Sequence, residues 1–454
     1  MRTGSAAAER ATADRPATGC AAAVVAPERA SVQESGAMTV QPPDLTPFFG
    51  LRPAPSASGP RDPRPGVSGL SPEAMGAWAK EHELPGYRAR QILDAVWRGR
   101  QEAFADVLTL PGPVRDQLAE SLRFDTMTET EIRITDGGLT EKAVHRLSDG
   151  LLVESVLMHY PARDGARERH TLCISSQAGC AVGCPFCATG ELGMERDLET
   201  AEIVDQVRHA QRRLSANGQH LTNVVFMGMG EPLLNLDRVL ESIEALNDPG
   251  RFALGARHIT VSTSGVVPGI RRLTALGPQF TLAISIHAAR NALRDVLVPL
   301  NRRWPVEEVV AAAREHADTT GRRVTYELTM IEGINDTDAD ADALAELLRG
   351  DLAHVNLIPM NQVAHTPWTG SPIPVVERYA ERVRAAGIAV TIRFNRGTEI
   401  GAACGQLAAE HAGQPTPAVV QRRRERIVAQ SAAALRGERS DEPGPALDAG
   451  EANA

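Results

Sequence analysis

The stretch CISSQAGCAVGCPFC, from Cys173 to Cys187, carries four of the six cysteines in this 454-residue chain. Within it, Cys180, Cys184 and Cys187 follow the spacing C-x3-C-x2-C. Thiols gathered on one short loop, unlike the dispersed framework of a secreted disulfide protein, indicate that they bind a metal. Three thiolates can hold three irons of a [4Fe–4S] cluster and leave the fourth iron open to another ligand.

Zinc is the competing interpretation of the cysteine triplet, with His170 as the fourth ligand. Structural zinc sites usually come as two cysteine pairs, and the sequence contains no second C-x2-C. An inert core is a poor explanation, because a loop rich in glycine and polar residues is a poor place to bury three thiols. Ligand type and spacing favour iron–sulfur and leave zinc open.

The composition limits the remaining classes of function. A net charge of −9 gives no global basic signature, so nucleic-acid binding cannot be argued from the charge. No apolar run reaches the roughly 18 residues that a membrane span needs. Charged residues interrupt the alanine-rich N-terminus, which argues against a signal peptide, so we expect a cytoplasmic protein without a membrane partner.

Two segments precede the predicted catalytic region. Residues 1–70 are rich in Ala, Pro, Ser and Gly and are predicted to be a disordered extension, in which Met38 is a possible alternative start. Residues 71–125 are predicted to be a small helical accessory domain. Ser71 and Pro72 are typical of a helix start. One helix face is formed by Ile92, Leu93, Val96 and Trp97.

The rest of the chain predicts an α/β fold. Residues 126–169 alternate as antiparallel strands with glycine turns, and Glu154 lies on the last of them. Residues 170–413 alternate strands with amphipathic helices, and the six strands are TLCISS, NVVFMGM, HITVSTS, TLAISIH, RVTYELTMI and HVNLIPM. Six βα units are too few for an eight-fold barrel, so we expect a partial, open barrel.

A last strand, AVTIRF, leads into the loop NRGTEIGAACGQL, which carries Cys404. Residues 414–454 are predicted to be an arginine-rich helix followed by a disordered tail.

The pentapeptide GMGEP, residues 228–232, ends the second barrel strand. Its glycines permit close approach of the backbone to a ligand, and Glu231 can receive an ammonium group. Taken alone, such a pentapeptide is most simply a turn.

The cysteine triplet at the end of the first strand of a partial βα barrel resembles the radical S-adenosylmethionine (SAM) superfamily. The resemblance implies a [4Fe–4S] cluster held by Cys180, Cys184 and Cys187, whose open iron binds SAM and yields a 5′-deoxyadenosyl radical. It also implies a set of SAM-contacting residues at strand ends, although a lone Ser or Asn at a strand end is most often a cap. These residues are Gly230, Glu231, Ser262, Ser285, Ile286, His287 and Asn361.

Over residues 70–410 the motifs CISSQAGC, GMGEPLLN and STSGVVP, together with Cys173 and Cys404, resemble the RlmN and Cfr family of RNA adenine methyltransferases, and its RlmN branch in particular. The resemblance implies methylation of carbon 2 of an adenine, at position 2503 of 23S rRNA and position 37 of tRNA, with two SAM per turnover. It implies that Cys404 forms an S-methylcysteine intermediate, that Cys173 resolves the intermediate through a transient disulfide with Cys404, and that Glu154 accepts a proton.

The resemblance to this family also predicts partners. The cluster needs an electron donor such as flavodoxin or ferredoxin. The helical segment 71–125 and the recurring arginine pairs are candidates for RNA phosphate contacts; the pairs are Arg212–Arg213, Arg271–Arg272, Arg302–Arg303 and Arg322–Arg323. Two alternatives stay open: a Cfr-like carbon-8 methyltransferase, and a zinc-stabilised RNA-binding module without catalysis.

Overall fold

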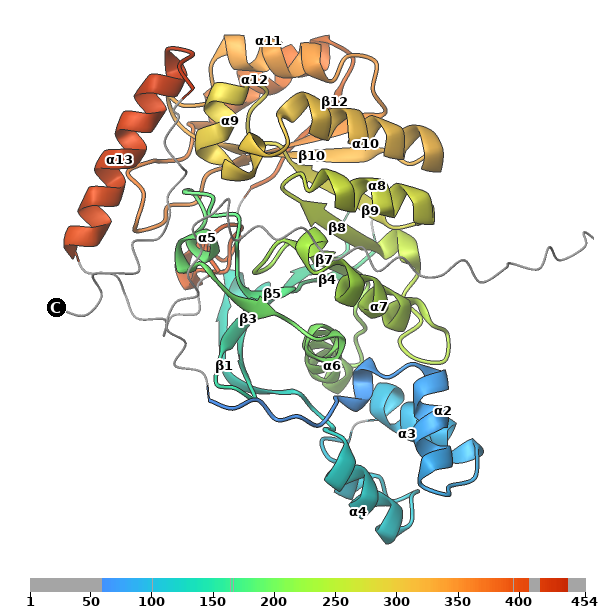
Figure 1. Cartoon of the computed structure of the whole chain (residues 1–454). Helices are drawn as coiled ribbons and strands as arrows, with labels where there is room; N and C mark the ends of the chain where they lie inside the picture. The colour runs from blue at the N-terminus through green and yellow to red at the C-terminus, as the bar shows by residue number, and fades with distance from the viewer. Residues whose placement is uncertain are drawn as a thin grey trace, which may run out of the picture. The chain divides into compact units, whose positions relative to one another are not determined.

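A ten-stranded sheet runs through the part of the chain that the computed structural model describes, namely residues 59–99, 101–163, 165, 167–394, 396–407 and 417–439 (Figure 1). Its strands, in the order of the sheet, are β1 (Met127–Thr135), β2 (Thr140–Leu147), β3 (Leu152–Tyr160), β4 (Arg169–Cys173), β7 (Asn223–Phe226), β8 (Ile259–Thr263), β9 (Thr281–Ser285), β10 (Val324–Met330), β11 (Ala353–Pro359) and β12 (Ala389–Ile392).

The sheet has an antiparallel and a parallel part. Strands β1 to β4 pair antiparallel, and every pair from β4 to β12 is parallel. Within the parallel part each strand lies beside the next one in the chain, which is the winding of a βα barrel. Because the described sheet ends at β1 and β12, the barrel is open. The predicted α/β partial barrel is confirmed.

Helices cross over between the parallel strands and cover the sheet (Figure 1). Their apolar faces point toward the sheet, which explains the amphipathic patterns in the sequence. They are α6 (Thr200–Ala216), α7 (Leu236–Asn247), α8 (Val267–Leu276), α9 (Asn291–Leu297), α10 (Val306–Thr320), α11 (Asp338–Leu347) and α12 (Ile373–Ala385).

Local sequence sets where these helices begin and end. Thr337 starts α11 because its hydroxyl accepts a hydrogen bond from the amide of Asp340 at 3.2 Å, and the Asp340 carboxylate accepts one in return from the amide of Thr337. Gly321, which adopts a left-handed conformation, ends α10. The core of the barrel is formed by fully buried aliphatic residues of the strands, such as Val261, Ile284 and Leu357.

In the described part of the chain, three α-helices precede the sheet: α2 (Pro72–Glu81), α3 (Tyr87–Arg98) and α4 (Gly112–Ser121). The predicted start at Ser71 is confirmed, because its hydroxyl accepts a hydrogen bond from the amide of Ala74 at 3.1 Å. The predicted face of α3 is also confirmed; its four residues, Ile92, Leu93, Val96 and Trp97, are all buried.

The packed part of the chain begins before residue 71, contrary to the predicted disordered extension over residues 1–70. Val67 and Ser68 are fully buried in a short 3-10 helix, and the amide of Val67 donates a hydrogen bond to the carbonyl of Arg123 at 2.9 Å. Burial of one apolar side chain and pairing of the backbone outweigh a composition typical of disorder. The rest of this prediction, over residues 1–58, lies outside the described residues.

The arginine-rich segment near the C-terminus forms α13 (Pro417–Leu435), as predicted, and α13 packs against α9. The predicted disordered tail from residue 440 lies outside the described residues. Among the described helices none is long and apolar enough to cross a membrane.

Candidate active site

The cysteine triplet lies on a loop that a small hairpin closes. After β4 the chain forms β5 (Gln177–Gly179), and β5 pairs antiparallel with β6 (Met194–Asp197). The predicted first strand TLCISS is therefore shorter than expected and ends at Cys173. Between β5 and β6 lie the loop and α5 (Ala188–Leu192), and the amide of Cys180 donates to the carbonyl of Gly193 at 2.7 Å. The hairpin thus holds both ends of the cysteine loop together.

The three thiols of the loop are electrostatically coupled. Cys180, Cys184 and Cys187 are half-buried, and none is in a disulfide. Burial raises the pKa of Cys184 well above its usual range, and the neighbouring Cys180 and Cys187 raise it further. Thiolates that destabilise one another in this way need a cation between them, and an iron–sulfur cluster supplies it.

Zinc fits the same loop poorly. Zinc–sulfur bonds of about 2.3 Å hold the ligand sulfurs within about 4 Å of one another. Among the described residues, the group of three ligand atoms within 4.8 Å of one another is Glu129, His145 and His209, and the three cysteines are not such a group. His170 is engaged elsewhere, because its Nδ1 lies 2.9 Å from that of His159 and its Nε2 lies 3.3 Å from Glu168.

GMGEP packs its backbone directly against β5. Gly230 has a φ of +106°, and a Cβ atom there would lie 2.6 Å from the Cβ of Gln177, so glycine is required. The amide of Glu231 donates to Gln177 Oε1 at 2.8 Å. The Glu231 carboxylate is buried and accepts hydrogen bonds from the amide and hydroxyl of Ser264, both at 2.7 Å, and burial raises its pKa. A buried carboxylate fixed in this way is suited to receive an ammonium group.

The ends of β8 and β9 bring three predicted SAM residues together. The hydroxyls of Ser262 and Ser285 lie 3.4 Å apart. His287 has a φ of +55°, which is unusual for a residue other than glycine. Its Nδ1 accepts a hydrogen bond from the amide of Thr329 at 3.0 Å, and its ring lies 4.5 Å from that of Phe186 in the cysteine loop. The strained His287 therefore links the strand ends to the cysteine loop.

Cys404 lies on a loop that reaches the same place from the C-terminal side. The carbonyl of Cys404 accepts a hydrogen bond from Asn361 Nδ2 at 2.9 Å, so this predicted SAM residue also holds the loop. Cys404 is exposed on one side. The protein around it nevertheless desolvates the thiol and, together with the charges of Cys187 and Glu327, raises its pKa to about 11.

Cys173 is the fifth described cysteine of the site. It is buried at the end of β4, and burial together with the charge of Cys404 raises its pKa to about 12. The two predicted catalytic thiols are therefore electrostatic neighbours.

Comparison with known proteins shows the family. The model of the Radical SAM superfamily matches residues 174–345. A protein of Parafrankia sp. (strain EAN1pec) named "Probable dual-specificity RNA methyltransferase RlmN" is 48% identical over 370 residues, which cover 78% of this chain and 94% of the relative. The protein of the same name from Thermobifida fusca is 49% identical over 348 residues, which cover 75% and 93%. This chain belongs to the RlmN family.

The RlmN assignment agrees with the solved structures. The crystal structure of a radical SAM methyltransferase from Sphaerobacter thermophilus superposes with a TM-score of 0.73 at 43% identity and covers 76% of this chain and 99% of that chain. The cofactors of an RlmN-family radical SAM enzyme are a [4Fe–4S] cluster and SAM. The donor set described above fits both: three neighbouring thiols on one loop for the cluster, and a fixed carboxylate at a glycine turn for SAM.

Glu154 is a buried carboxylate, not an exposed one on the surface of the sheet. It is fully buried on β3, and its Oε1 lies 3.5 Å from Nζ of Lys142, which is also buried. Lys142 in turn lies close to the Cys404 loop, because a Cβ at Gly401 would be 3.4 Å from its Nζ. The predicted proton acceptor is thus connected to the Cys404 loop through a buried lysine.

Two charged groups of the RlmN site carry no recognisable sequence signal. Arg294 on α9 is fully buried and donates to the carbonyls of Ile286 at 2.9 Å and Ser264 at 2.6 Å. Glu327 on β10 is buried, and its Oε1 accepts a hydrogen bond from Asn356 at 2.8 Å. Neither residue belongs to a recognisable motif, so only the fold reveals that both lie behind the site.

The arginine pairs proposed for RNA contacts are partly engaged within the protein. Arg212 lies 2.7 Å from Asp125, and Arg213 forms an ion pair with Glu129. Arg272 lies 2.5 Å from Asp237. These contacts are the ordinary role of surface arginines, so RNA binding by these pairs remains a prediction.

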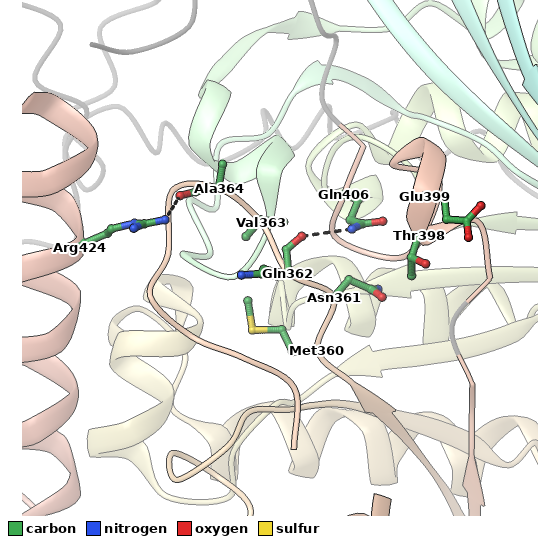
Figure 2. A pocket seen from close by; sticks show the side chains of 9 residues that line it. All are labelled: Met360, Asn361, Gln362, Val363, Ala364, Thr398, Glu399, Gln406 and Arg424. Carbon is green, nitrogen blue, oxygen red and sulfur yellow. Dashed lines mark hydrogen bonds between the residues drawn. The ribbon is translucent and has the colours of Figure 1, made fainter. Parts of the chain in front are cut away.

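Figure 2 shows a pocket of about 600 Å³ beside the Cys404 loop. Asn361 lines it together with Gln406 of the Cys404 loop, and Arg424 enters from α13. Nη2 of Arg424 donates to the carbonyl of Ala364 at 2.5 Å, and Gln406 Nε2 donates to the carbonyl of Gln362 at 3.1 Å. Its lining is mixed, with one cation, Arg424, one carboxylate, Glu399, polar side chains and the apolar Met360 and Val363.

Proposed function

We propose that this enzyme methylates carbon 2 of an adenine in RNA, at position 2503 of 23S rRNA and at position 37 of tRNA. The observation that carries the proposal is that Cys404 lies on a loop hydrogen-bonded to the segment after Cys187, while its charge also raises the pKa of Cys173. Two further thiols at this place are unnecessary for holding a cluster. The names of the relatives, which call them dual-specificity RNA methyltransferases, support the RNA substrates.

The chemistry of the substrate explains why such a site is needed. Carbon 2 of adenine lies between two electron-withdrawing nitrogens and is not nucleophilic, so it cannot displace a methyl group from SAM directly. When bound, the cluster and SAM supply a 5′-deoxyadenosyl radical, and SAM also supplies the methyl group. The residues of the chain must bind these groups, exclude water and pass the methyl group on.

Cys404 is proposed as the methyl carrier. Its sulfur attacks the methyl carbon of one SAM, so that a new sulfur–carbon bond forms, S-adenosylhomocysteine leaves and the thiol proton is lost. Removal of a hydrogen atom from the resulting S-methyl group gives a carbon radical that adds to carbon 2, so that RNA and Cys404 become covalently joined. The exposed side of Cys404 is the side from which RNA can reach it.

Glu154 and Cys173 are proposed to complete the turnover. Glu154 accepts the proton from carbon 2, and Lys142 at 3.5 Å fixes its carboxylate. Cys173 then loses its proton and attacks the sulfur of Cys404, so that a sulfur–sulfur bond forms and the carbon–sulfur bond breaks. The freed CH2 group takes up a proton to become the methyl group, the unpaired electron of the adduct passes to a one-electron acceptor such as the bound cluster, and the disulfide is left for an external reductant. Two SAM are consumed per turnover, and a small redox protein such as flavodoxin or ferredoxin supplies electrons to the cluster.

Nucleoside mass spectrometry tests the substrate. RNA from a host lacking its own enzyme is compared with and without this gene. Gene-dependent 2-methyladenosine in the ribosomal and transfer RNA fractions is expected. Gene-dependent 8-methyladenosine would show that the enzyme methylates carbon 8 instead. No new methyladenosine from protein that carries its cluster would refute the RNA substrate.

Two variants test the thiols. Cys404→Ala should abolish RNA methylation, because it removes the proposed methyl carrier; retained methylation would remove Cys404 from the mechanism. Cys173→Ala should accumulate a covalent protein–RNA adduct, visible as a gel shift that RNase removes. A variant that turns over without any adduct would show that Cys173 is not the resolving thiol.

A further inference from the structure

The Cys404 loop is hydrogen-bonded directly to the segment that follows the last cluster cysteine. The amide of Ala188, the residue after Cys187, donates to the carbonyl of Gly405 at 2.7 Å. The hydroxyl of Thr189 donates to the carbonyl of Leu407 at 2.5 Å. Thr189 is buried, and its bond joins residues 218 positions apart in the chain.

The two loops also touch through their backbones at Gly405. Gly405 has a φ of +80°, and a Cβ atom there would lie 3.3 Å from the carbonyl oxygen of Phe186, inside the cysteine loop. A side chain at this position would be strained by the positive φ and would require one loop to shift by a few tenths of an ångström. The two loops are therefore in close contact at Gly405.

The loop after β11 completes a closed set of contacts. Asn361 holds the carbonyl of Cys404, as described above, and Nε2 of His365 lies 2.9 Å from the carbonyl of Pro185 in the cysteine loop. The cysteine loop, the loop after β11 and the Cys404 loop each contact the other two. The position of Cys404 thus depends on how the cysteine loop is folded.

Thr189 follows Cys187, the last cluster ligand, by two positions, and its side chain is buried. Its one hydroxyl proton is donated to the Cys404 loop, at the carbonyl of Leu407. A valine of the same shape would leave the carbonyl of Leu407 without its donor.

We propose that Thr189 is a positioning residue that couples the Cys404 loop to the cluster loop, so that Cys404 stands in its reactive position only when the cluster loop is folded around its metal. This inference rests on the proposed role of Cys404 as methyl carrier. Without the coupling, SAM is still cleaved but Cys404 is misplaced. Radical formation is then uncoupled from methyl transfer.

Thr189→Val tests this coupling, with Thr189→Ser as the variant that restores the hydroxyl. Cluster content and its EPR spectrum should stay as in the wild type. S-methylation of Cys404, read by peptide mass, should fall about tenfold, since one buried hydrogen bond is lost. The amount of 5′-deoxyadenosine formed per methyl group transferred should rise, and Thr189→Ser should reverse both changes.

The position and mobility of the Cys404 loop can also be measured without turnover of the enzyme. Alkylation of Cys404 by iodoacetamide and hydrogen exchange over residues 398–407 should be faster in Thr189→Val than in the wild type. Removal of the cluster from the wild type should have the same effect. Thr274→Val is the matched control, because Thr274 is also buried and its hydroxyl donates to a carbonyl, that of Ile270, at 2.9 Å on α8.

The outcomes separate this inference from the proposed function. Unchanged S-methylation, product ratio and alkylation in Thr189→Val would overturn the coupling, whatever the RNA product is. If Thr189→Val fails to load its cluster, Gly405→Ala is measured in its place, because it disrupts the same contact from the other loop. Wild-type protein that S-methylates Cys404 but modifies no RNA would refute the substrate and leave the coupling standing.

Discussion

At the scale of single residues, Arg294 shows how a buried charge can organise a site. Its guanidinium joins the ends of two neighbouring strands by donating to carbonyls in both, and it also donates to Asn301 Oδ1 at 2.9 Å. Burial lowers its pKa to about 10, which still leaves it charged at neutral pH. Five fixed donors suit arginine to this role.

Arg294→Met should lower the free energy of unfolding by about 3 kcal/mol, because several buried acceptors lose their donor. It should also weaken SAM binding, since two of these acceptors belong to the ends of β8 and β9. Thermal denaturation and anaerobic equilibrium dialysis with SAM measure the two effects. Arg271→Met, at an arginine with 55% of its side chain exposed, is the control. Equal stability of both variants would contradict this role.

His145 makes stability depend on pH. It is fully buried between Ser155, whose hydroxyl lies 2.8 Å from Nε2, and the groups of α6 and β1 that face it, namely His209, Arg213 and Glu129. Burial, then the charges of His209 and Arg213, lower its pKa well below 6.5. The folded state therefore keeps His145 neutral below pH 6.5, where the unfolded chain takes up a proton. Stability is present above this pH and is lost as the pH falls.

The loss attributable to His145 should be about 1.4 kcal/mol per pH unit below 6.5. In His145→Phe, the drop in unfolding free energy between pH 7 and pH 5 should therefore be smaller than in the wild type by about 2 kcal/mol. Urea denaturation at both pH values measures it. The exposed His220→Gln should behave like the wild type. A pH dependence unchanged in His145→Phe would refute the assignment.

At the scale of elements, α13 is a helix outside the barrel that also reaches the pocket beside the Cys404 loop. It packs against α9, buries Ile427 and Ala434, and brings Arg423 into an ion pair with Glu191 of α5. Arg424 of the same helix lines the pocket beside the Cys404 loop (Figure 2). The packing of α13 therefore shapes one wall of that pocket.

Ile427→Asp should release α13, because it places an unpaired carboxylate in an apolar contact at a cost of about 2 kcal/mol or more. Limited proteolysis should then cut within residues 417–435, and the affinity for RNA should fall with the loss of Arg424 from the pocket. Val428→Asp is the matched control, since the neighbouring Val428 is 53% exposed. Equal protease resistance of the two variants would show that α13 is held by other contacts.

At the scale of the whole molecule, the cluster is expected to be part of the folded structure. The cysteine loop contacts the hairpin, the strand ends and the Cys404 loop, so metal bound there stabilises all of them by linkage. Anaerobically prepared protein should be brown and contain about four irons per chain. One zinc per chain and no iron would contradict this assignment.

Removing the iron with a chelator should lower the melting temperature by about 4 °C or more. Calorimetry of holoprotein and chelated protein measures the change. The triple variant Cys180→Ser, Cys184→Ser, Cys187→Ser should show no difference between the two treatments. A melting temperature that is equal with and without iron would show that the loop folds independently of its metal.

The sequence by itself determined the kind of protein. Strand and helix periodicity predicted the open α/β barrel, and the unusual spacing of Cys180, Cys184 and Cys187 predicted the cluster loop, because both signals are local along the chain. The prediction of disorder from composition was wrong for residues 59–70, because the burial of Val67 depends on residues far away in the sequence.

Only the tertiary structure decided which distant residues act together. The contact of the Cys404 loop with the segment after Cys187 crosses more than two hundred positions, and the pairing of Glu154 with Lys142 depends on the register of β2 and β3. Arg294 and Glu327 belong to no sequence motif, and only their burial beside the site identifies them. Such contacts follow from packing of strands and loops, and packing is not local in the sequence.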